Sequence, residues 1–374
     1  MVDRPKPRIL MGNQAAAEGA LAAGCGFYAG YPITPSSEIM ELLADRLPAA
    51  GGVFVQMEDE IASISAVIGA AWSGARAMTA TSGPGLSLMI EALGYAAMTE
   101  TPLVLVDVQR AGPATGQATR IGSGDILQVR YGPHGDTSPI ALSPWSVQEM
   151  YDLTIRAFDL AERFRVPTFV LADEGVGHLR ESVVLHRDFQ LSARRRDTDQ
   201  PPFGCDRPDG VPPMPAFGDG AKLLITGSTH DAWGYRRVDT PQAHATLVER
   251  INRKVEDHAA EIIDLERHAL DDARLAVVAY GFTARAAKAA VKQLRAEGLA
   301  VGLLRLKTLW PFPEAALAEL GARVDRLLVP EMNRGQVLGL VRQSTDCEAL
   351  GLWQTDGEVI APERIAARVR EVMP

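Results

Sequence analysis

The sequence predicts an α/β protein built from two blocks, each with a parallel, doubly wound sheet. Short apolar or β-branched runs alternate with longer helical runs along most of the chain, as in folds where strands alternate with helices. A Pro-rich interval, 189–220, interrupts this alternation, which is typical of a linker. The length of 374 residues suits two or three domains of roughly 150 residues each. We therefore divide the chain into 1–188, 189–220 and 221–374.

The first block is expected to open with an Ala-rich helix, which Gly24 ends as glycine does at helix C-termini. The second helix is expected to have Thr34 as its N-cap and Pro35 in its first turn. In order, the expected elements are a helix over 12–23, a strand over 26–30, a helix over 35–47, a strand over 53–57, a helix over 59–72, a strand over 77–81, a helix over 86–98, a strand over 102–107, a helix over 147–164 and a strand over 168–171.

The second block is expected to be a smaller α/β unit. It includes a long, charged, helical stretch over 240–268, which has little apolar stripe and should lie on a partner or on the first block. The expected elements are then a strand over 275–280, a helix over 283–297, a strand over 300–306, a helix over 313–320, a strand over 326–330 and a helix over 362–372.

Charge and hydropathy exclude two classes of partner. Lys plus Arg number 38 and Asp plus Glu number 47, which gives a net charge of −9. The run Arg194-Arg195-Arg196 is too short to form the positive patch that nucleic-acid binding requires. No apolar run approaches the roughly 18 residues of a membrane span, and the polar N-terminus lacks the apolar stretch of a signal peptide. We expect no nucleic-acid or membrane partner and a cytoplasmic location.

The sequence lacks the common metal-binding and nucleotide-binding motifs. Cys25, Cys205 and Cys347 lie far apart and are too few for an iron–sulfur cluster. The sequence has no HExxH, GxGxxG or P-loop motif. The triplet Gly218-Asp219-Gly220 resembles the start of a thiamine-diphosphate metal motif, but 245–248 lacks the required Asn. We expect no metal site within this chain.

The segment 30–38, with the sequence GYPITPSSE, joins an expected strand to an expected helix. Ligands of such folds bind at the carboxyl edge of the sheet, and two prolines make this segment a rigid wall. The hydroxyl of Thr34 and the amides of the following helix could hold a carboxylate. The alternative is a plain helix cap with proline in its first turn.

Three acids, Glu58, Asp59 and Glu60, follow the next strand. For Glu58 and Asp59 the better interpretation is that they complement a helix dipole. Glu60 leads into a nearly uncharged, closely packed helix. Burial there would raise the pKa of its carboxyl group and let it donate or share a proton.

Arg110 follows a buried strand within the run QRAGP. An arginine on a Gly/Pro loop at a strand end could clamp a carboxylate through two parallel hydrogen bonds, although it could also be a surface residue. Arg120, Arg130 and His134 follow in the same region. They could bind a second acidic group, or they could be solvated.

Several long motifs, in the right order, resemble the alpha subunit of the 2-oxoacid:ferredoxin oxidoreductases and cover about residues 10–345. The SSE after YPITP, together with Val176-Gly177-His178, is most similar to the 2-oxoglutarate branch. The matching motifs are YPITPSSE, QMEDEIASISAVIGAAWSGARAMTATSGPG, DVQRAGPATG, ITGSTHDAWG, LWPFP and PEMNRGQ.

The resemblance implies a thiamine-diphosphate enzyme whose site is shared between chains. This chain would supply a pyrimidine-binding domain and a smaller transketolase-C-like domain. Glu60 would be catalytic, through a hydrogen bond to the aminopyrimidine ring of the cofactor. The wall formed by Tyr31, Pro32 and Ile33 would line that cofactor. Thr34 and Arg110 would bind the 1-carboxylate of the substrate, and Arg120 is a weaker candidate for its other end.

The resemblance also implies partners. A beta subunit would supply the diphosphate and Mg²⁺ site and a 4Fe–4S cluster, in an alpha-beta or alpha2-beta2 assembly. The reaction would convert 2-oxoglutarate and coenzyme A to succinyl-CoA and CO2, with electrons passing to ferredoxin. Enzymes for 2-oxoisovalerate or pyruvate are alternatives, because substrate choice depends on a few pocket residues. A non-catalytic scaffold subunit is disfavoured, because Glu60, Thr34 and Arg110 are all present.

Overall fold

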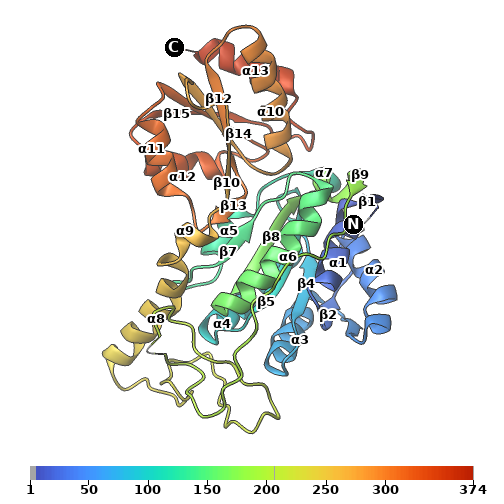
Figure 1. Cartoon of the computed structure of the whole chain (residues 1–374), viewed down its shortest axis with the longest axis vertical. Coiled ribbons are helices and arrows are strands. Elements are labelled where there is room, and N and C mark those ends of the chain that lie inside the picture. The colour runs from blue at the N-terminus through green and yellow to red at the C-terminus, as the bar shows by residue number, and fades with distance from the viewer. Residues whose placement is uncertain (1–5, 206, 374) are drawn as a thin grey trace.

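The structure, a computed structural model, describes residues 6–205 and 207–373. Two sheets are stacked along its long axis, and helices cover the faces of each (Figure 1). The part of the chain that is described contains no helix long and apolar enough to cross a membrane.

The first sheet is almost entirely parallel and has the strand order β13-β7-β8-β5-β4-β2-β3. Only the pairing of β13 with β7 is antiparallel in this order, and β6 adds an antiparallel hairpin to the end of β5. The strands are β2 (Phe27–Gly30), β3 (Val53–Gln56), β4 (Ala77–Thr81), β5 (Leu103–Ala111), β6 (Gln117–Ile121), β7 (Ile140–Leu142), β8 (Pro167–Asp173) and β13 (Thr308–Trp310). A separate pair joins β1 (Arg8–Met11) to β9 (Arg180–Val183).

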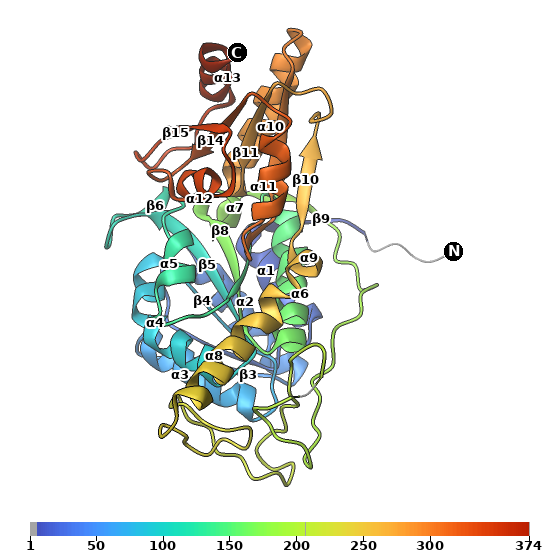
Figure 2. The same ribbon diagram turned by 90° about the vertical axis from the view of Figure 1, so that its left-hand side faces the viewer.

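Helices cover both faces of the first sheet because its central strands are apolar on both sides. On β5, Leu103 and Leu105 pack with α3 and α4, whereas Val104 and Val106 pack with α1, α2 and α6. Figure 2 shows α3 and α4 beside the strands from a second direction. The helices are α1 (Gly12–Ala22), α2 (Ser37–Arg46), α3 (Glu60–Trp72), α4 (Gly83–Met98), α5 (Ile126–Tyr131), α6 (Val147–Phe164) and α7 (Glu174–His178), and η1 (Pro48–Ala50) is a 3-10 turn.

Two boundaries near the candidate site differ from the prediction. The α2 helix has Ser36, not Thr34, in its N-cap position. The backbone N–H of Ser36 donates to the carbonyl of Ile33, so a turn that contains the cis peptide Thr34–Pro35 precedes the helix. The predicted N-cap role of Thr34 is therefore wrong. The β5 strand is longer than expected and includes Arg110, because its end pairs with both β8 and β6.

The second sheet has the order β10-β12-β11-β14-β15, with β10 antiparallel and the other strands parallel. Its elements are β10 (Leu265–His268), β11 (Leu275–Ala279), α10 (Gly281–Ala296), β12 (Val301–Leu306), α11 (Glu314–Gly321), β14 (Arg326–Glu331), α12 (Gln336–Ser344), β15 (Glu348–Trp353) and α13 (Pro362–Val372).

The charged stretch over 240–268 is divided into α8 (Pro241–Glu256), α9 (Ala259–Ile262) and β10. The α8 helix lies on the first block, because its Arg250 and Lys254 both form ion pairs with the fully buried Glu100. The second sheet begins at Leu265.

The Pro-rich interval runs through loops at the lower end of the molecule (Figure 1), and its described residues form no helix or strand. Buried arginine holds it in place: Arg165 donates to the carbonyls of Pro202 and Pro213. Within the Gly-Asp-Gly triplet, Asp219 accepts from the backbone N–H of Ala216 and pairs with Arg196. The triplet is therefore occupied by local structural contacts.

Candidate active site

Four parallel strands bring the candidate residues to one edge of the first sheet. The strands β5, β4, β2 and β3 are consecutive neighbours, so their carboxyl ends meet at the edge where ligands bind in such sheets. The segments that follow or end these strands contain the Tyr31–Thr34 wall, Glu60, the Gly83–Gly85 turn and Arg110.

Glu60 is the first residue of α3 and is only 5% exposed. The preceding residue, Asp59, caps the helix by accepting from the N–H of Ala62 at 2.7 Å. Burial raises the pKa of Glu60, and the nearby Asp59 charge adds to this effect, while the backbone N–H of Glu60 opposes it. Among the described residues, no other side chain forms a hydrogen bond with this carboxyl group, so it can serve a ligand.

Gly85, in the first turn of α4, packs against the side chain of Glu60. A Cβ at this position would lie 2.5 Å from Glu60 Oε1 and 2.0 Å from Thr81 Oγ1. We did not single out Gly85 from the sequence, although its SGPG run was a usable signal. The close approach of α4 to Glu60 therefore requires glycine.

Arg110 and Thr34 meet directly. Arg110 Nη1 donates to the carbonyl oxygen of Thr34 at 2.8 Å, and the arginine is 8% exposed. Its Nε is buried and has no hydrogen-bond partner in the part of the chain that is described. The guanidinium is thus anchored through Nη1, and its buried Nε–H is left unsatisfied.

The residues of the Tyr31–Thr34 segment are exposed apart from Ile33, which is half-buried. Tyr31 is 40% exposed. The turn behind it is fixed by Asn13, whose amide donates to the carbonyl of Pro35 and to Glu38 Oε2, both at 2.7 Å. His178 lies 3.5 Å from the other oxygen of Glu38. The SSE and VGH motifs therefore meet directly behind this wall.

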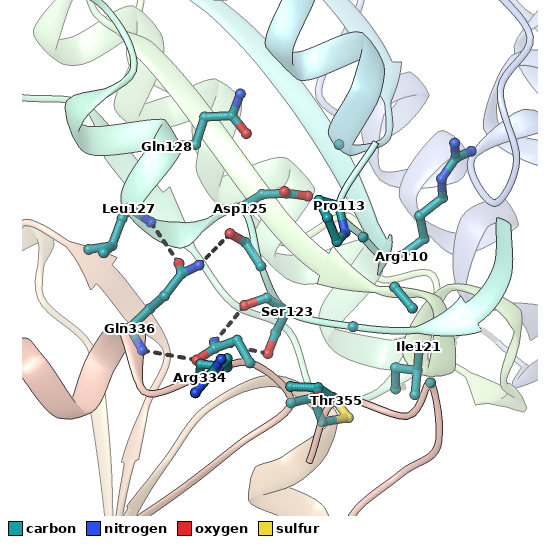
Figure 3. Close-up of a pocket in the computed structure, with 18 of the residues that line it drawn as sticks. Arg110, Pro113, Ile121, Ser123, Asp125, Leu127, Gln128, Arg334, Gln336 and Thr355 are labelled. Carbon is teal, nitrogen blue, oxygen red and sulfur yellow. Dashed lines mark hydrogen bonds between the residues drawn. The ribbon is translucent and has the colours of Figure 1, made fainter. Parts of the chain in front are cut away.

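A cavity of about 820 Å³ lies beside Arg110, between the two blocks. Figure 3 shows Gln128, Asp125, Pro113 and Arg110 along one side and Gln336, Arg334 and Thr355 along the other. Gln336 Nε2 donates to the carbonyl of Gly124 at 2.6 Å. Asn333 donates to the carbonyl of Ser123, also at 2.6 Å. The second block thus forms one wall of the cavity and is hydrogen-bonded to the other wall.

The remaining predicted cations do not line this cavity. Arg120 forms an ion pair with Glu358, and Arg130 donates to the carbonyl of Thr137. His134 is exposed on a loop. The exposed Arg334, which we did not single out, does line the cavity. Its motif PEMNRGQ was visible in the sequence, but its position depends on how the two blocks pack.

The family described as "Pyruvate flavodoxin/ferredoxin oxidoreductase, thiamine diP-bdg" matches residues 18–250. The chain belongs to this family. A second family, "Pyruvate:ferredoxin oxidoreductase core domain II", matches residues 273–365 of this oxidoreductase chain. Both the predicted family and the predicted fold class are confirmed.

Relatives within the oxidoreductase family are similar over nearly their whole length. "2-oxoglutarate synthase subunit KorA" of Methanocaldococcus jannaschii is 52% identical over 89% of this chain and 90% of its own. The protein of the same name from Methanothermobacter thermautotrophicus is 49% identical over 96% of each chain. "Ketoisovalerate oxidoreductase subunit VorB" of the latter organism is 37% identical over 98% of this chain and 97% of its own.

Two solved structures have a similar fold. The 2-oxoglutarate:ferredoxin oxidoreductase from Magnetococcus marinus, with 2-oxoglutarate, coenzyme A and succinyl-CoA bound, superposes with a TM-score of 0.93 at 34% identity. The match covers 98% of this chain but 65% of that one. A split-gene transketolase matches 97% of this chain and 98% of its own, with a TM-score of 0.57 at 12% identity, a likeness of fold alone.

Proposed function

We propose that this chain is the alpha subunit of a thiamine-diphosphate-dependent 2-oxoglutarate:ferredoxin oxidoreductase. The reaction converts 2-oxoglutarate and coenzyme A to succinyl-CoA and CO2, and ferredoxin receives the electrons. One observation carries this proposal. A buried Glu60 carboxyl and an Arg110 guanidinium with an unsatisfied N–H lie at the same edge of one sheet. Relatives named 2-oxoglutarate synthase subunits, at 49–52% identity, support the choice of substrate.

The residues present fit a thiamine cofactor. When bound, thiamine diphosphate supplies the nucleophilic carbon and the electron sink that decarboxylation of a 2-oxoacid requires. Glu60 would hold the aminopyrimidine through its carboxyl group, whose raised pKa suits the sharing of a proton with a ring nitrogen. Gly85 keeps that carboxyl uncrowded. Tyr31, Pro32 and Ile33 would line the cofactor.

Arg110 binds the 1-carboxylate of the substrate. Its anchored Nη1 fixes the plane of the guanidinium, so the free Nε–H points in one direction. A planar, preorganised donor group of this kind loses little freedom when it binds a carboxylate. Thr34 contributes by holding Arg110 through its backbone carbonyl, and its exposed side chain leaves the hydroxyl accessible to the same ligand.

The beta subunit completes the site in this proposal. It supplies the Mg²⁺–diphosphate site and the 4Fe–4S cluster, in an alpha2-beta2 assembly that reacts with ferredoxin and coenzyme A. The chain has three cysteines. One is buried and the other two are half-buried at distant positions, which supports the assignment of the cluster to the partner chain.

The test is to co-purify the chain with its beta subunit and to measure 2-oxoacid-dependent dye reduction. We expect the highest kcat/KM for 2-oxoglutarate, above those for pyruvate and 2-oxoisovalerate. A preference for 2-oxoisovalerate would favour the second candidate, which the 37% identity to a ketoisovalerate oxidoreductase subunit supports. A complex that binds thiamine diphosphate but reduces no dye with any 2-oxoacid would contradict the proposal.

A further inference from the structure

Asp107 is a buried acid for which the proposed reaction has no assigned role. It lies on β5, three residues before Arg110, and its exposure is 0%. Its neighbours across the sheet are Thr81 on β4 and Leu171 on β8, neither of which is charged. Neither carboxyl oxygen has a hydrogen-bond donor among the described residues. An ionised carboxylate in such a place would be strongly destabilising.

The second acid of the pair is Asp125, which lies next to Asp107 on the side of the cavity. It occupies the N-cap position of α5 and lines the cavity. Its carboxyl group interacts with that of Asp107, and its buried Oδ2 also lacks a donor within the described chain. A Cβ on Gly83 would lie 3.2 Å from this oxygen, so the wall of the cavity closes tightly over the pair.

We propose that Asp107 and Asp125 share one proton and that this pair sets the charge of the cavity wall beside Arg110, where the 2-oxoacid carboxylate binds. A carboxylate can only accept hydrogen bonds. One proton held between the two groups supplies the donor that both lack and removes one of two adjacent negative charges. This inference rests on the proposed function for its substrate but not for its geometry.

The surroundings of the pair agree with a shared proton. Burial raises the pKa of Asp107 well above its ordinary value, and the charge of Asp125 raises it further. Burial also raises the pKa of Asp125 to about 6, although the hydrogen bond with Asp107 and the charge of Arg110 oppose this. Both shifts favour one proton shared by the pair over two ionised carboxylates.

That single charge matters for Arg110. A pair with one negative charge balances the guanidinium and leaves its free N–H to the substrate. Loss of the shared proton would add a second negative charge next to the carboxylate subsite and weaken substrate binding. Two other charged groups border the region: Arg334 lines the far side of the same cavity, and Glu60 lies beyond the Gly83–Gly85 turn, against Gly85.

Kinetics test the functional half of the proposal. In the alpha-beta enzyme, the KM for 2-oxoglutarate should rise roughly tenfold from neutral to alkaline pH, with kcat changed much less. In Asp107→Asn the amide replaces the shared proton as donor. We expect the alkaline rise in KM to disappear in this variant. Asp136→Asn, which removes an exposed acid from the same block, should retain the wild-type profile.

Infrared spectroscopy tests the shared proton without turnover. The wild-type complex should show a protonated carboxyl absorption at neutral pH that is absent from Asp107→Asn and from Asp125→Asn and present in Asp136→Asn. If Asp107→Asn does not fold, Asp125→Asn on the cavity wall provides the same comparison. If the complex turns over 2-oxoacids but lacks this absorption, the shared proton is refuted and the proposed function stands. The absorption in a complex that turns over no 2-oxoacid would refute the function and leave the shared proton intact.

Discussion

Glu60 shows which single residues can be found from a sequence. Its position after a strand, at the start of a nearly uncharged helix, predicted burial, and the structure gives it 5% exposure. Gly85 and Asp125 were not predicted, because their roles arise from the approach of α4 and α5 to neighbouring strand ends. Such contacts depend on strand order, which local sequence patterns do not encode.

Replacement of Glu60 tests its role most directly. In Glu60→Gln the amide cannot share a proton as a carboxyl group does, so turnover should fall by about 10² to 10⁴. Assembly with the beta subunit should be unchanged. The measurements are dye reduction under saturating substrate and gel filtration of the complex. Glu58→Gln is the control, because Glu58 is exposed two residues earlier, and equal losses in both variants would refute the assignment.

Arg110 should affect every 2-oxoacid in the same way, because each carries the carboxylate it binds. Lysine retains the charge but lacks the planar fork, so Arg110→Lys should reduce transition-state binding by about 1–3 kcal/mol. The ratio of kcat/KM values for 2-oxoglutarate and pyruvate should stay within tenfold of wild type. A larger change in this ratio would mean that Arg110 binds the distal end of the substrate.

Arg120→Ala serves as the control for this experiment. Arg120 is paired with Glu358 and does not line the cavity, so its loss should leave the substrate ratio unchanged. If Arg120→Ala selectively impairs 2-oxoglutarate, the distal carboxylate reaches β6 and the pairing seen here is broken on binding.

Strands and helices with a strong local pattern were predicted correctly, including α6 and β4 with the observed limits. Elements defined by distant pairing were missed. The three residues of β13 join the first sheet although they belong to the second half of the chain, and β6 exists because it pairs with the end of β5. The start of α2 was misplaced because the turn at Thr34–Pro35 closes before the helix begins.

The α3 and α4 helices offer a matched pair of glycine variants. Gly85→Ala should improve helix propensity but place a methyl group against Glu60 Oε1, so thiamine binding and turnover should fall at least tenfold. In Gly69→Ala, on α3, the new Cβ meets nothing within 4 Å, and stability should rise by about 0.5–1 kcal/mol. Calorimetric titration with thiamine diphosphate and thermal unfolding would measure the two effects. Wild-type affinity in Gly85→Ala would show that Glu60 does not touch the cofactor.

At the scale of the whole molecule, a buried ion-pair cluster attaches α8 to the first block. Burial raises the pKa of Glu100, but the charges of Lys254 and Arg250 outweigh this effect and hold the pKa well below its usual range. Both partners donate hydrogen bonds to its carboxylate, at 2.6–2.8 Å. The extended interval is joined to the same cluster, because Arg250 Nη2 also donates to the carbonyl of Phe203.

Removal of this charge should destabilise the chain strongly. Glu100→Gln leaves Lys254 buried without a counter-charge, which should cost about 3–5 kcal/mol of unfolding free energy. Glu249→Gln removes an exposed partner of Arg253 and should change stability by less than about 0.5 kcal/mol. Denaturant unfolding would measure both.

The sign of the pH dependence follows from the lowered pKa of Glu100. Its stabilisation is fully present above the unfolded-state pKa of about 4.3 and is lost as the pH falls further. The wild-type advantage over Glu100→Gln should therefore persist at neutral pH and shrink in acid. An advantage that vanished already at neutral pH would contradict this account.

The pairing of β13 with β7 also has a consequence for how the molecule can be divided. Because Thr308–Trp310 forms the edge strand of the first sheet, a polypeptide ending before Leu265 would lack its own border and expose the backbone of β7. Exposed edges of this kind favour aggregation. We expect residues 6–264 expressed alone to be insoluble or oligomeric. The same residues co-expressed with 265–373 should give a monodisperse complex, in which the second fragment acts as a folding partner of the first.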